Sequence, residues 1–267
     1  MRVLEQFVER PRDCAYLANR AASLDVRVML DVTSSELERL LERGWRRFGP
    51  IYFRPVCTQC AECVSLRVLA DRFAPNKSQR RAERASAGLR RVIGPPLVDD
   101  ARLALYAKWH ASREDRRGWD PNPQNRRRYA LELAFPHPCA REAAFYDDER
   151  GGALVAVGLF DVTESALSAI FFYYDPQYAR QSLGTANVVS LVRDAAAAGR
   201  RHVYLGYRVA GCPSLRYKAA FRPNELLHGR PGGLDESADW RSSESASSAD
   251  VSEGSPETRS ALAPTPS

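Results

Sequence analysis

Four cysteines near the N-terminus constrain the fold of this chain more than any other feature. Cys57, Cys60 and Cys63 stand at C-x2-C-x2-C spacing, and Cys14 lies well upstream of them. Thiolates this close in sequence can hold zinc at about 2.3 Å or bind an iron–sulfur cluster, and Cys14 completes a set of four ligands if the N-terminal segment folds back. The spacing does not distinguish zinc from an iron–sulfur cluster, and four reduced, partly buried cysteines are the alternative without a metal. We expect the first third of the chain to be built round such a site.

Length and composition favour a cytoplasmic protein of one or two domains. A chain of 267 residues fits one large or two modest domains at roughly 100–200 residues each. No stretch approaches the ~18 apolar residues that cross a bilayer, and residues 1–6 lack the apolar core of a secretory signal. Clustered cysteines in the reducing cytosol bind metals or catalyse more often than they form disulfides. We therefore expect a cytoplasmic location and no membrane partner.

The charge is unevenly distributed along the chain. The net charge is +6, but residues 231–267 hold seven acidic and only two basic side chains among many Ser, Ala and Pro residues. A segment with so little apolar surface cannot offset its ordering entropy, so we expect a disordered acidic tail over residues 231–267. The rest of the chain is rich in arginine, which is typical of proteins that bind phosphate groups. A GC-rich genome that replaces lysine by arginine is the alternative.

Turn signals and apolar periodicity predict an α+β fold in two domains. A capping-box pattern of Ser35 and Glu38 before an apolar stripe predicts a helix that ends at Gly44. The Gly-Pro-Pro sequence at 94–96 predicts a boundary between domains 1–94 and 95–230. Beyond it we expect, in chain order, a helix over 99–117, strands over 142–147, 152–161 and 166–174, a helix over 182–198 and a strand over 202–207. The three strands form an antiparallel meander, and the whole fits one sheet with helices against it.

A basic helix is predicted after the cysteines. Residues 76–78, Asn-Lys-Ser, open a helix that runs through 79–89. At helical spacing its basic residues share one face, which suits a phosphate backbone. An ordinary solvated helix face is the alternative. This basic face consists of Lys77, Arg80, Arg81 and Arg84.

Two further motifs lie in the second half of the chain. Residues 181–186, Gln-Ser-Leu-Gly-Thr-Ala, resemble the Q-x-x-G-x-G/A signature of the GNAT acyltransferase superfamily, in which backbone N–H groups at a helix start hold an anionic carrier. Gln181 and Gly184 are therefore candidates for such a site. Residues 204–223 gather Tyr, Arg and Lys at a strand end, where Arg216 and Lys218 are suited to clamp a carboxylate. A seam between domains is the alternative for this block.

Taken together, these stretches resemble the arginyl-tRNA–protein transferase family, and within it the branch of bacterial aspartate/glutamate leucyltransferases. The resemblance covers about residues 10–227 in one continuous order, and several of its motifs are long. The acidic tail lies outside it. The matching segments are Cys14–Leu17, Gly44–Cys63, Phe73–Arg81, Phe172–Pro176, Ser182–Gly184 and Tyr204–Pro223.

The resemblance implies an enzyme that transfers leucine from Leu-tRNA to the α-amine of proteins beginning with Asp or Glu, which marks them for degradation by the N-degron pathway. It implies a GNAT-like acyltransferase domain with a small cysteine-bearing N-terminal domain. In eukaryotic relatives that domain is reported to bind an iron–sulfur cluster. The matching positions here are Cys14, Cys57, Cys60 and Cys63. Because the aminoacyl ester is already activated, we expect the transfer itself to require no cofactor.

The implied reaction assigns roles to the candidate residues. An α-amine of pKa ~7.7–8.0 is partly neutral at pH 7, so a weak base is sufficient. We expect Asp175 to be that base or to orient the amine, with Tyr174 beside it. The residues expected to bind the acceptor are Tyr207, Arg216, Tyr217 and Lys218, and those expected to bind Leu-tRNA are Lys77, Arg80, Arg81, Arg84, Gln181 and Gly184.

Two other functions are compatible with parts of the sequence. An acetyl-CoA-dependent GNAT N-acetyltransferase would use the same loop at 181–186, although a small carrier needs no large arginine-rich surface. A zinc-dependent RNA-binding module without enzymatic activity would account for the cysteines and the charge, but not for the block at 204–223. Turnover of acetyl-CoA in the absence of tRNA separates the acetyltransferase from the aminoacyltransferase.

Overall fold

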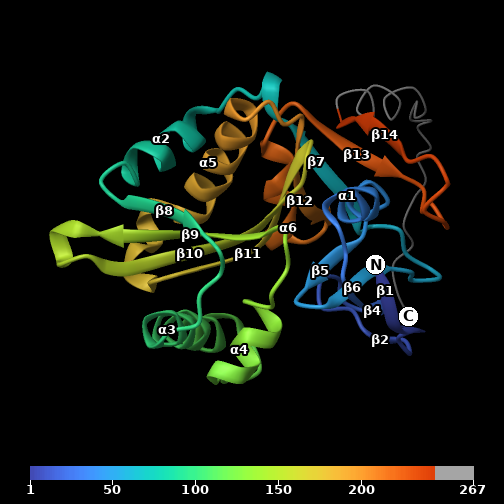
Figure 1. The fold of residues 1–267 in the computed structure, drawn as a ribbon, viewed down its shortest axis with the longest axis horizontal. Helices are drawn as coiled ribbons and strands as arrows, with labels where there is room; N and C mark the ends of the chain where they lie inside the picture. The colour runs from blue at the N-terminus through green and yellow to red at the C-terminus, as the bar shows by residue number, and fades with distance from the viewer. Residues whose placement is uncertain (244–267) are drawn as a thin grey trace, which may run out of the picture.

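A large mixed β-sheet forms the centre of the protein (Figure 1). The computed structural model describes residues 1–243, with the side chains of 116 and 117 excepted. Within this part of the chain the sheet has eight strands, in the spatial order β14 (Asp239–Ser242), β13 (Asn224–His228), β7 (Val64–Leu69), β12 (His202–Arg208), β11 (Ala166–Tyr174), β10 (Ala153–Val162), β9 (Ala140–Asp147) and β8 (Arg90–Gly94). All neighbours are antiparallel except β11 and β12, which run parallel.

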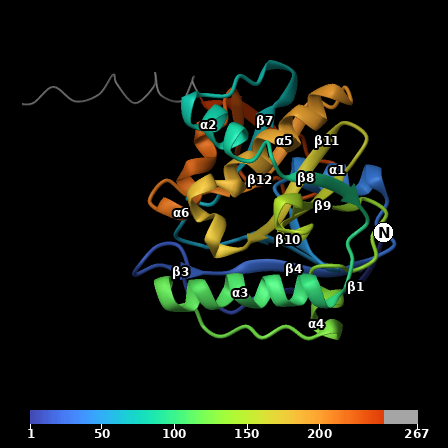
Figure 2. The same cartoon turned by 90° about the vertical axis from the view of Figure 1, so that its left-hand side faces the viewer.

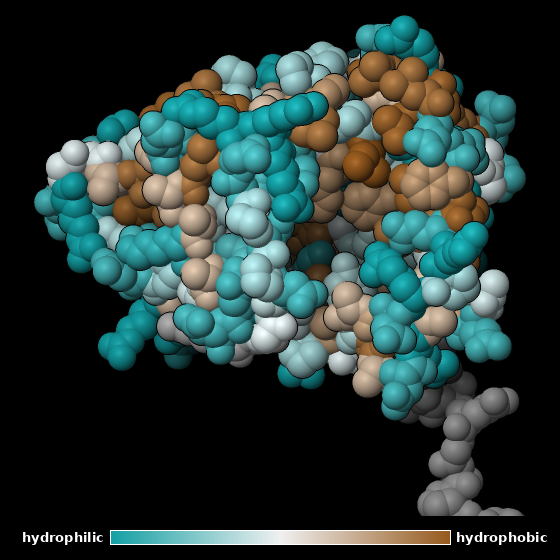
Figure 3. All heavy atoms as spheres, turned by 90° about the horizontal axis from the view of Figure 1, so that it is seen from below, coloured by the Kyte–Doolittle hydropathy of each residue, from teal (hydrophilic) through white to brown (hydrophobic). Residues whose placement is uncertain are grey.

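A smaller antiparallel sheet lies beside the large one and contains most of the N-terminal segment. Its strands, in spatial order, are β1 (Arg2–Val8), β4 (Leu24–Leu30), β6 (Ile51–Pro55) and β5 (Arg46–Phe48), and a short pair, β2 (Arg12–Asp13) with β3 (Ala21–Ala22), extends from it. β1 is an edge strand, and four of its apolar side chains are exposed. Figure 3, which views the molecule from below, shows apolar surface on the side where β1 lies and a hollow at the centre of this face.

The helices cover both faces of the large sheet. In order along the chain they are α1 (Ser34–Glu42), α2 (Lys77–Ala85), α3 (Asp100–Arg117), α4 (Arg126–Glu132), α5 (Leu183–Ala197) and α6 (Pro213–Arg216). Figures 1 and 2 show α2 and α5 on one face and α3 and α4 on the other. This is a mixed α and β structure round a central mixed sheet, as expected for the fold class. None of these helices has the length and apolar character needed to cross a membrane.

Apolar side chains fill the space on each face of the sheet. The cluster beneath α5 consists mainly of aliphatic residues such as Val189, Leu191 and Val203. The cluster beneath α3 is largely aromatic and includes Tyr106, Trp109 and Tyr173. A third cluster joins α1 to both sheets, because its residues come from α1, β4, β6, β11 and β12. Burial of these faces holds the strands of the meander in register.

The local signals for helices and strands are confirmed with two corrections. The helix predicted to run through 79–89 already ends at Ala85, because residues 86–88 form a turn. The meander, the helices predicted over 99–117 and 182–198 and the strand over 202–207 are all present within two residues of the expected bounds. The capping box of α1, however, uses Thr33 and Glu36 in place of Ser35 and Glu38. Glu36 accepts from the backbone N–H of Thr33 at 2.9 Å and pairs with the N-terminal amine at 2.7 Å. Glu38 instead accepts from the backbone N–H of Ser165 at 3.1 Å, so a tertiary contact decides which pair caps the helix.

The C-terminal segment is ordered further than the expected start of the tail at residue 231. Residues 239–242 form β14, which pairs with β13. Trp240 packs edge-on against Tyr204, receives the guanidinium of Arg67 over its ring at 4.4 Å and donates to the carbonyl of Glu42 at 2.9 Å. One aromatic side chain thus anchors a segment whose composition is otherwise typical of disorder. The rest of the predicted tail, residues 244–267, lies outside the described residues.

The large sheet takes strands from both sides of the predicted domain boundary at residue 94. β8 ends at Gly94 and pairs with β9, and β7 lies between β12 and β13. The chain changes from the small sheet to the large one between Pro55 and Val64, which is where the C-x2-C-x2-C segment lies. The cysteine segment is therefore the connection between the two sheets, and residue 94 is not where they divide.

A buried ion pair joins the two sheets. Nε of Arg47 in β5 donates to Oδ2 of Asp161 in β10 at 2.9 Å, and Nη2 donates to Oδ1. The two side chains are only 4% and 1% exposed. Nη1 of Arg47 also donates to the carbonyl of Gly49 at 3.0 Å. Removing one partner leaves the other charge buried and unpaired, which costs much more than the pair contributes.

We predict that Arg47→Met lowers the free energy of unfolding by about 3–5 kcal/mol, because it leaves the Asp161 carboxylate buried without a counter-charge. The double variant Arg47→Met/Asp161→Leu should recover most of that loss, since no isolated charge remains. Urea unfolding followed by circular dichroism measures both. A single variant as stable as the wild type would show that the pair does not hold the sheets together.

Candidate functional site

The large sheet opens between its two parallel strands. β11 and β12 pair only at residues 166–168 and 202–204, although β11 continues to Tyr174 and β12 to Arg208. On its other side, β12 stays paired with β7, with a shift in register between Tyr204 and Gly206. Gly206 has φ +76°, a left-handed conformation that side chains other than glycine rarely adopt. The strands therefore diverge where β12 bends, and the edges of both face the opening.

Arg46 fills the start of this opening. Its Nη1 donates to Oγ of Ser168 at 2.9 Å, and its Nη2 donates to the carbonyl of Ala169, both in β11. On the side of β12, a Cβ built on Gly206 would lie 3.2 Å from Nε of Arg46. The absence of a side chain at Gly206 thus provides the space for the guanidinium. Burial is the main reason that the pKa of Arg46 is lowered.

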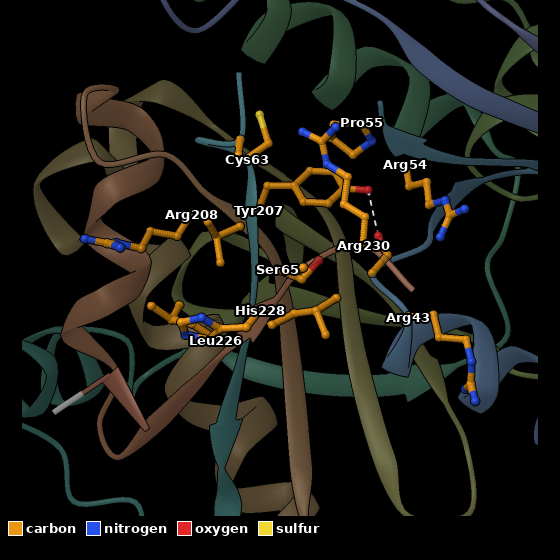
Figure 4. A pocket seen from close by; sticks show the side chains of 15 residues that line it. Arg43, Arg54, Pro55, Cys63, Ser65, Tyr207, Arg208, Leu226, His228 and Arg230 are labelled. Carbon is orange, nitrogen blue, oxygen red and sulfur yellow. Dashed lines mark hydrogen bonds between the residues drawn. The ribbon is translucent and has the colours of Figure 1, made fainter. Parts of the chain in front are cut away.

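Lys218 and Tyr207, both predicted to bind the acceptor, lie together next to Arg46. Nζ of Lys218 donates to the carbonyl of Tyr207 at 2.9 Å, and the pKa of this half-buried lysine is lowered to about 7 by burial and then by the nearby charge of Arg46. The hydroxyl of Tyr207 lies 2.9 Å from the carbonyl of Gly44, to which it donates (Figure 4). Tyr207 is thereby fixed between α1 and β12.

Arg216 and Tyr217 are placed differently from Lys218. Both side chains are exposed, on α6 and the turn that follows it. In the described part of the chain neither forms a hydrogen bond with Tyr207 or Lys218. The predicted carboxylate clamp therefore has Lys218 at the opening and Arg216 at the surface.

Asp175 and Tyr174 lie at the end of β11, where both have structural partners. The Asp175 carboxylate accepts from the backbone N–H of Gln177 at 3.0 Å and so caps the 3-10 helix over 176–181. It also accepts from Nζ of Lys108 in α3 at 2.7 Å. The hydroxyl of Tyr174 accepts from Nη2 of Arg113 in α3 at 3.2 Å. The side chains are thus anchored at the mouth of the opening, and their catalytic roles stay predictions.

The loop at 181–186 forms the start of α5, as predicted. The N-cap residue, Ser182, has φ +56° and makes no capping hydrogen bond with its side chain, so the first N–H groups of the helix are left without a side-chain acceptor. Oε1 of Gln181 is buried and has no hydrogen-bond partner in the described part of the chain. A Cβ on Gly184 would meet the ring of Phe172 in β11 at 3.6 Å. The geometry suits an anion at this helix terminus.

The predicted basic face lies on α2 and is exposed. α2 has a capping box formed by Asn76 and Gln79, and it packs on α5 through buried Gln79 and Ala82. Glu83 binds Nη2 of Arg193 in α5 at 3.1 Å, which fixes the helix pair. The exposed basic residues are Lys77, Arg80, Arg81 and Arg84.

The N-terminal segment folds back and brings the four cysteines to one cavity. This cavity, of about 90 Å³, is lined by Cys14, Cys57, Cys60 and Cys63 together with Tyr207. Burial, followed by the neighbouring thiols, raises the pKa of Cys63 to about 12. All four cysteines are reduced, and within residues 1–243 no three His, Cys, Asp or Glu side chains converge closely enough to hold a metal ion. The donor set has the chemistry of a zinc or iron–sulfur site, and a bound group would have to draw the thiols together.

A larger cavity of about 390 Å³ lies on the other side of Tyr207 and Cys63. Of the residues that the structure describes, no Asp or Glu lines it. Figure 4 shows Arg208 pointing away on the side opposite Arg43 and Arg54. This cavity was not predicted from the sequence, because its lining comes from segments far apart in the chain: the residues just after α1, and β6, β7, β12 and β13. The arginines of its lining are Arg43, Arg54, Arg208 and Arg230.

Comparisons with known proteins identify relatives along most of the chain. Residues 12–81 match the family described as "Arginine-tRNA-protein transferase, N terminus", and residues 101–228 match "Arginine-tRNA-protein transferase, C terminus". A protein of Halorhodospira halophila named aspartate/glutamate leucyltransferase is 37% identical over 82% of this chain and 92% of its own length. A Campylobacter jejuni protein of the same name is 32% identical over 81% of this chain and 90% of its own length.

Solved structures give a weaker likeness. The C-terminal domain of a lysylphosphatidylglycerol synthetase from Agrobacterium fabrum aligns with a TM-score of 0.41 and 16% identity, over 65% of this chain and 51% of that one. This score is too low to support a statement about function.

The folded-state pKa of Lys218 is about 7, whereas that of an unfolded lysine is ~10.4. Below pH 7 the lysine is charged in the folded protein, and its destabilising effect is then fully present. The penalty is lost as the pH rises from about 7 to 10.4, where only the unfolded state stays protonated. We predict that Lys218→Met raises Tm at pH 6 by at least about 2–4 °C, the shift that 1 kcal/mol produces in a protein of this size.

Scanning calorimetry at pH 6 and pH 9 measures this difference, which should shrink at the higher pH. Lys77→Met, on the exposed basic face, is the matched control and should change Tm equally little at both pH values. A gain for Lys218→Met that does not depend on pH would contradict the lowered pKa.

Proposed function

The chain belongs to the arginine-tRNA-protein transferase family, and from this premise we propose that it transfers leucine from Leu-tRNA to the N-terminal α-amine of proteins beginning with Asp or Glu. The observation that carries the proposal is the cationic opening between β11 and β12, which holds Arg46 and Lys218. The start of α5, which has no side-chain cap, packs against the same strand β11 through Gly184 and Phe172. Such a site suits an anionic carrier on one side and an acidic acceptor on the other. Tagged proteins would be directed to degradation.

The proposed reaction exchanges an ester for an amide. The lone pair of the acceptor's α-amine attacks the ester carbonyl of leucyl-tRNA, a C–N bond forms, and the C–O bond to the terminal ribose breaks. The proton lost by the amine passes to the ribose oxygen. Holding the two reactants in line can supply up to ~7–11 kcal/mol of the barrier, and backbone N–H donors to the oxyanion add ~2.7–4 kcal/mol each. No redox or Lewis-acid step is needed, in keeping with the expectation that no cofactor takes part.

We assign the proton transfer to Asp175, directly or through water, with Tyr174 and Lys108 fixing its position. The carboxylate already accepts a charged hydrogen bond from Lys108, which would have to be shared with or exchanged for the amine of the acceptor. The open parallel strands next to the start of α5 support a GNAT-like arrangement, with Gln181 and Gly184 near the carrier. The use of aminoacyl-tRNA would place the reaction in the cytoplasm.

One assay tests the proposed function directly. Purified protein is offered leucyl-tRNA, arginyl-tRNA or acetyl-CoA together with peptides that begin with Asp, Glu, Lys or Arg. Transfer of leucine to the Asp and Glu peptides is the expected result. Acetylation of the same peptides without any tRNA would replace the proposal by the N-acetyltransferase alternative.

The exposed basic face of α2 is proposed to bind the tRNA backbone. Replacing Arg80 and Arg81 by Gln should weaken Leu-tRNA binding and reduce the slope of log Kd against log salt by roughly 1–2, since each released phosphate contact contributes ~0.7–0.9. Filter binding at several salt concentrations measures the slope. The matched control replaces Arg127 and Arg128 of α4, on the opposite face of the large sheet. An unchanged slope in the α2 variant would exclude this face from the tRNA site.

Zinc or an iron–sulfur cluster is proposed to bind the four thiols that line the smaller cavity. Elemental analysis and absorbance of protein purified without oxygen should find zinc or iron, and Cys57→Ser should lose it. Cys139→Ala, which changes a buried cysteine in the core beneath α1, is the control and should keep the metal. Metal-free wild-type protein that is folded and active would refute the site.

A further inference from the structure

Arg46 and Lys218 are two neighbouring cations without a counter-charge. The hydrogen-bond partners of Arg46 are the hydroxyl of Ser168 and the carbonyl of Ala169, and that of Lys218 is the carbonyl of Tyr207, so all three are neutral. Within the described residues neither side chain forms an ion pair.

Arg47 shows the contrast. It stands next to Arg46 in the same strand, but both oxygens of Asp161 bind its guanidinium. Asp161 is also the carboxylate whose charge acts on Arg46, and its charge is already offset by Arg47. The structure thus neutralises buried Arg47 and leaves the adjacent, half-buried Arg46 with its positive charge.

Desolvated cations of this kind are costly unless an anion accompanies them. The cost is visible at both residues, because burial lowers the pKa of each. The charge of Arg46 lowers the pKa of Lys218 further, and the charge of Arg47 lowers that of Arg46. Groups perturbed in this way gather at functional sites, where a ligand supplies the missing charge. The two cations therefore mark a receptor for an anion at residues 206 and 207 of β12.

The donors that remain free describe the anion. Among residues 1–243, Nε of Arg46 has no hydrogen-bond partner, and it faces the space where Gly206 lacks a side chain. Nζ of Lys218 uses only one of its three N–H groups there. A planar guanidinium beside an ammonium matches a carboxylate. The opening is also where the α-amine of the acceptor must meet the ester, and the side-chain carboxylate of an N-terminal Asp or Glu lies only a few bonds from that amine.

We propose that Arg46, together with Lys218, binds the side-chain carboxylate of the acceptor's first residue and so selects acidic acceptors. This assignment rests on the proposed aminoacyl transfer. It replaces exposed Arg216 by half-buried Arg46 as the residue that binds the carboxylate together with Lys218. Arg46 is a specificity residue of the site, because the part of the acceptor it touches does not react.

The test compares peptides that begin with Asp or with Asn, which have the same shape but differ in charge. With Leu-tRNA saturating, Arg46→Gln should lower kcat/KM for the Asp peptide roughly 10- to 100-fold, the range expected for one hydrogen bond between charged groups. The value for the Asn peptide and the Kd for Leu-tRNA should change less than about twofold. Arg39→Gln, an exposed arginine on α1, removes the same charge elsewhere and should leave the Asp/Asn ratio at its wild-type value.

Lys218→Gln is the second variant, because Arg46 also joins β5 to β11 and its loss could unfold the protein. It should lower the Asp/Asn ratio at pH 6 and have less effect at pH 9, where the wild-type lysine is largely neutral. An Asp/Asn ratio unchanged in Lys218→Gln, or an equal loss for both peptides in Arg46→Gln, would overturn the assignment. Weaker binding of Leu-tRNA with an unchanged Asp/Asn ratio of kcat/KM would also overturn the assignment. It would identify the anion bound by the two cations as a tRNA phosphate. A wild-type protein that transfers no leucine to either peptide would instead refute the proposed function.

Discussion

The buried pair of Arg47 and Asp161 is the contact on which the site depends, because it fixes the small sheet against the large one. Asp161 is the cross-strand partner of Ser168, so the pair lies directly beside the last paired position of β11 and β12. Arg47 holds Asp161 while Arg46 reaches Ser168 and Ala169. Two consecutive residues of the edge strand β5 thus bind two neighbouring strands of the large sheet, β10 and β11. The ion pair of Arg47 thereby determines where the guanidinium of Arg46 lies.

The turn after β5 further restricts the position of this strand. Gly49 has φ +54°, and a Cβ on it would lie 2.1 Å from the carbonyl oxygen of Leu131, just before the end of α4. Only glycine fits between the hairpin and that helix. The carbonyl of Gly49 in turn accepts from Arg47. The close approach of Gly49 to Leu131 and the two interactions of Arg47 therefore restrict β5 to one position. These interactions lie outside the opening, and they offset the free-energy cost of keeping Arg46 without a counter-charge.

The sequence predicted most local structure and less of the site, for a physical reason. Caps such as Asn76 and Asp99 and the alternation of the meander are set by neighbours in the chain, so their patterns predict the elements correctly. The choice of Thr33 over Ser35 and the order at Trp240 depend on contacts with distant residues, which no local pattern contains. Lys218 was identified because it lies in a dense motif.

Arg46 could not be predicted from the sequence, because no local pattern shows that an arginine in a short strand is partly buried. Its partners are 122 and 123 residues away, and its lack of a carboxylate partner becomes visible only when Arg47 is seen to occupy Asp161. Arg216, in contrast, was predicted because it lies in the same dense block as Lys218, but the turn at 217–220 directs only Lys218 toward β12. A motif can thus indicate the chemistry of a site before it shows which side chains supply it.

The cysteine cavity is continuous with the same structure and not a separate module. Tyr207 and Cys63 line both cavities, and the segment from Cys57 to Cys63 is the connection by which the chain passes from β6 to β7. Arg230, just after β13, donates to the carbonyls of Cys57 at 2.9 Å and Cys60 at 2.6 Å. Any group that draws the thiols together would therefore act on the wall that holds Tyr207, whose carbonyl binds Lys218. The cysteines and the cationic opening are thus joined through Tyr207, which lines the cysteine cavity with its side chain and binds Lys218 with its carbonyl.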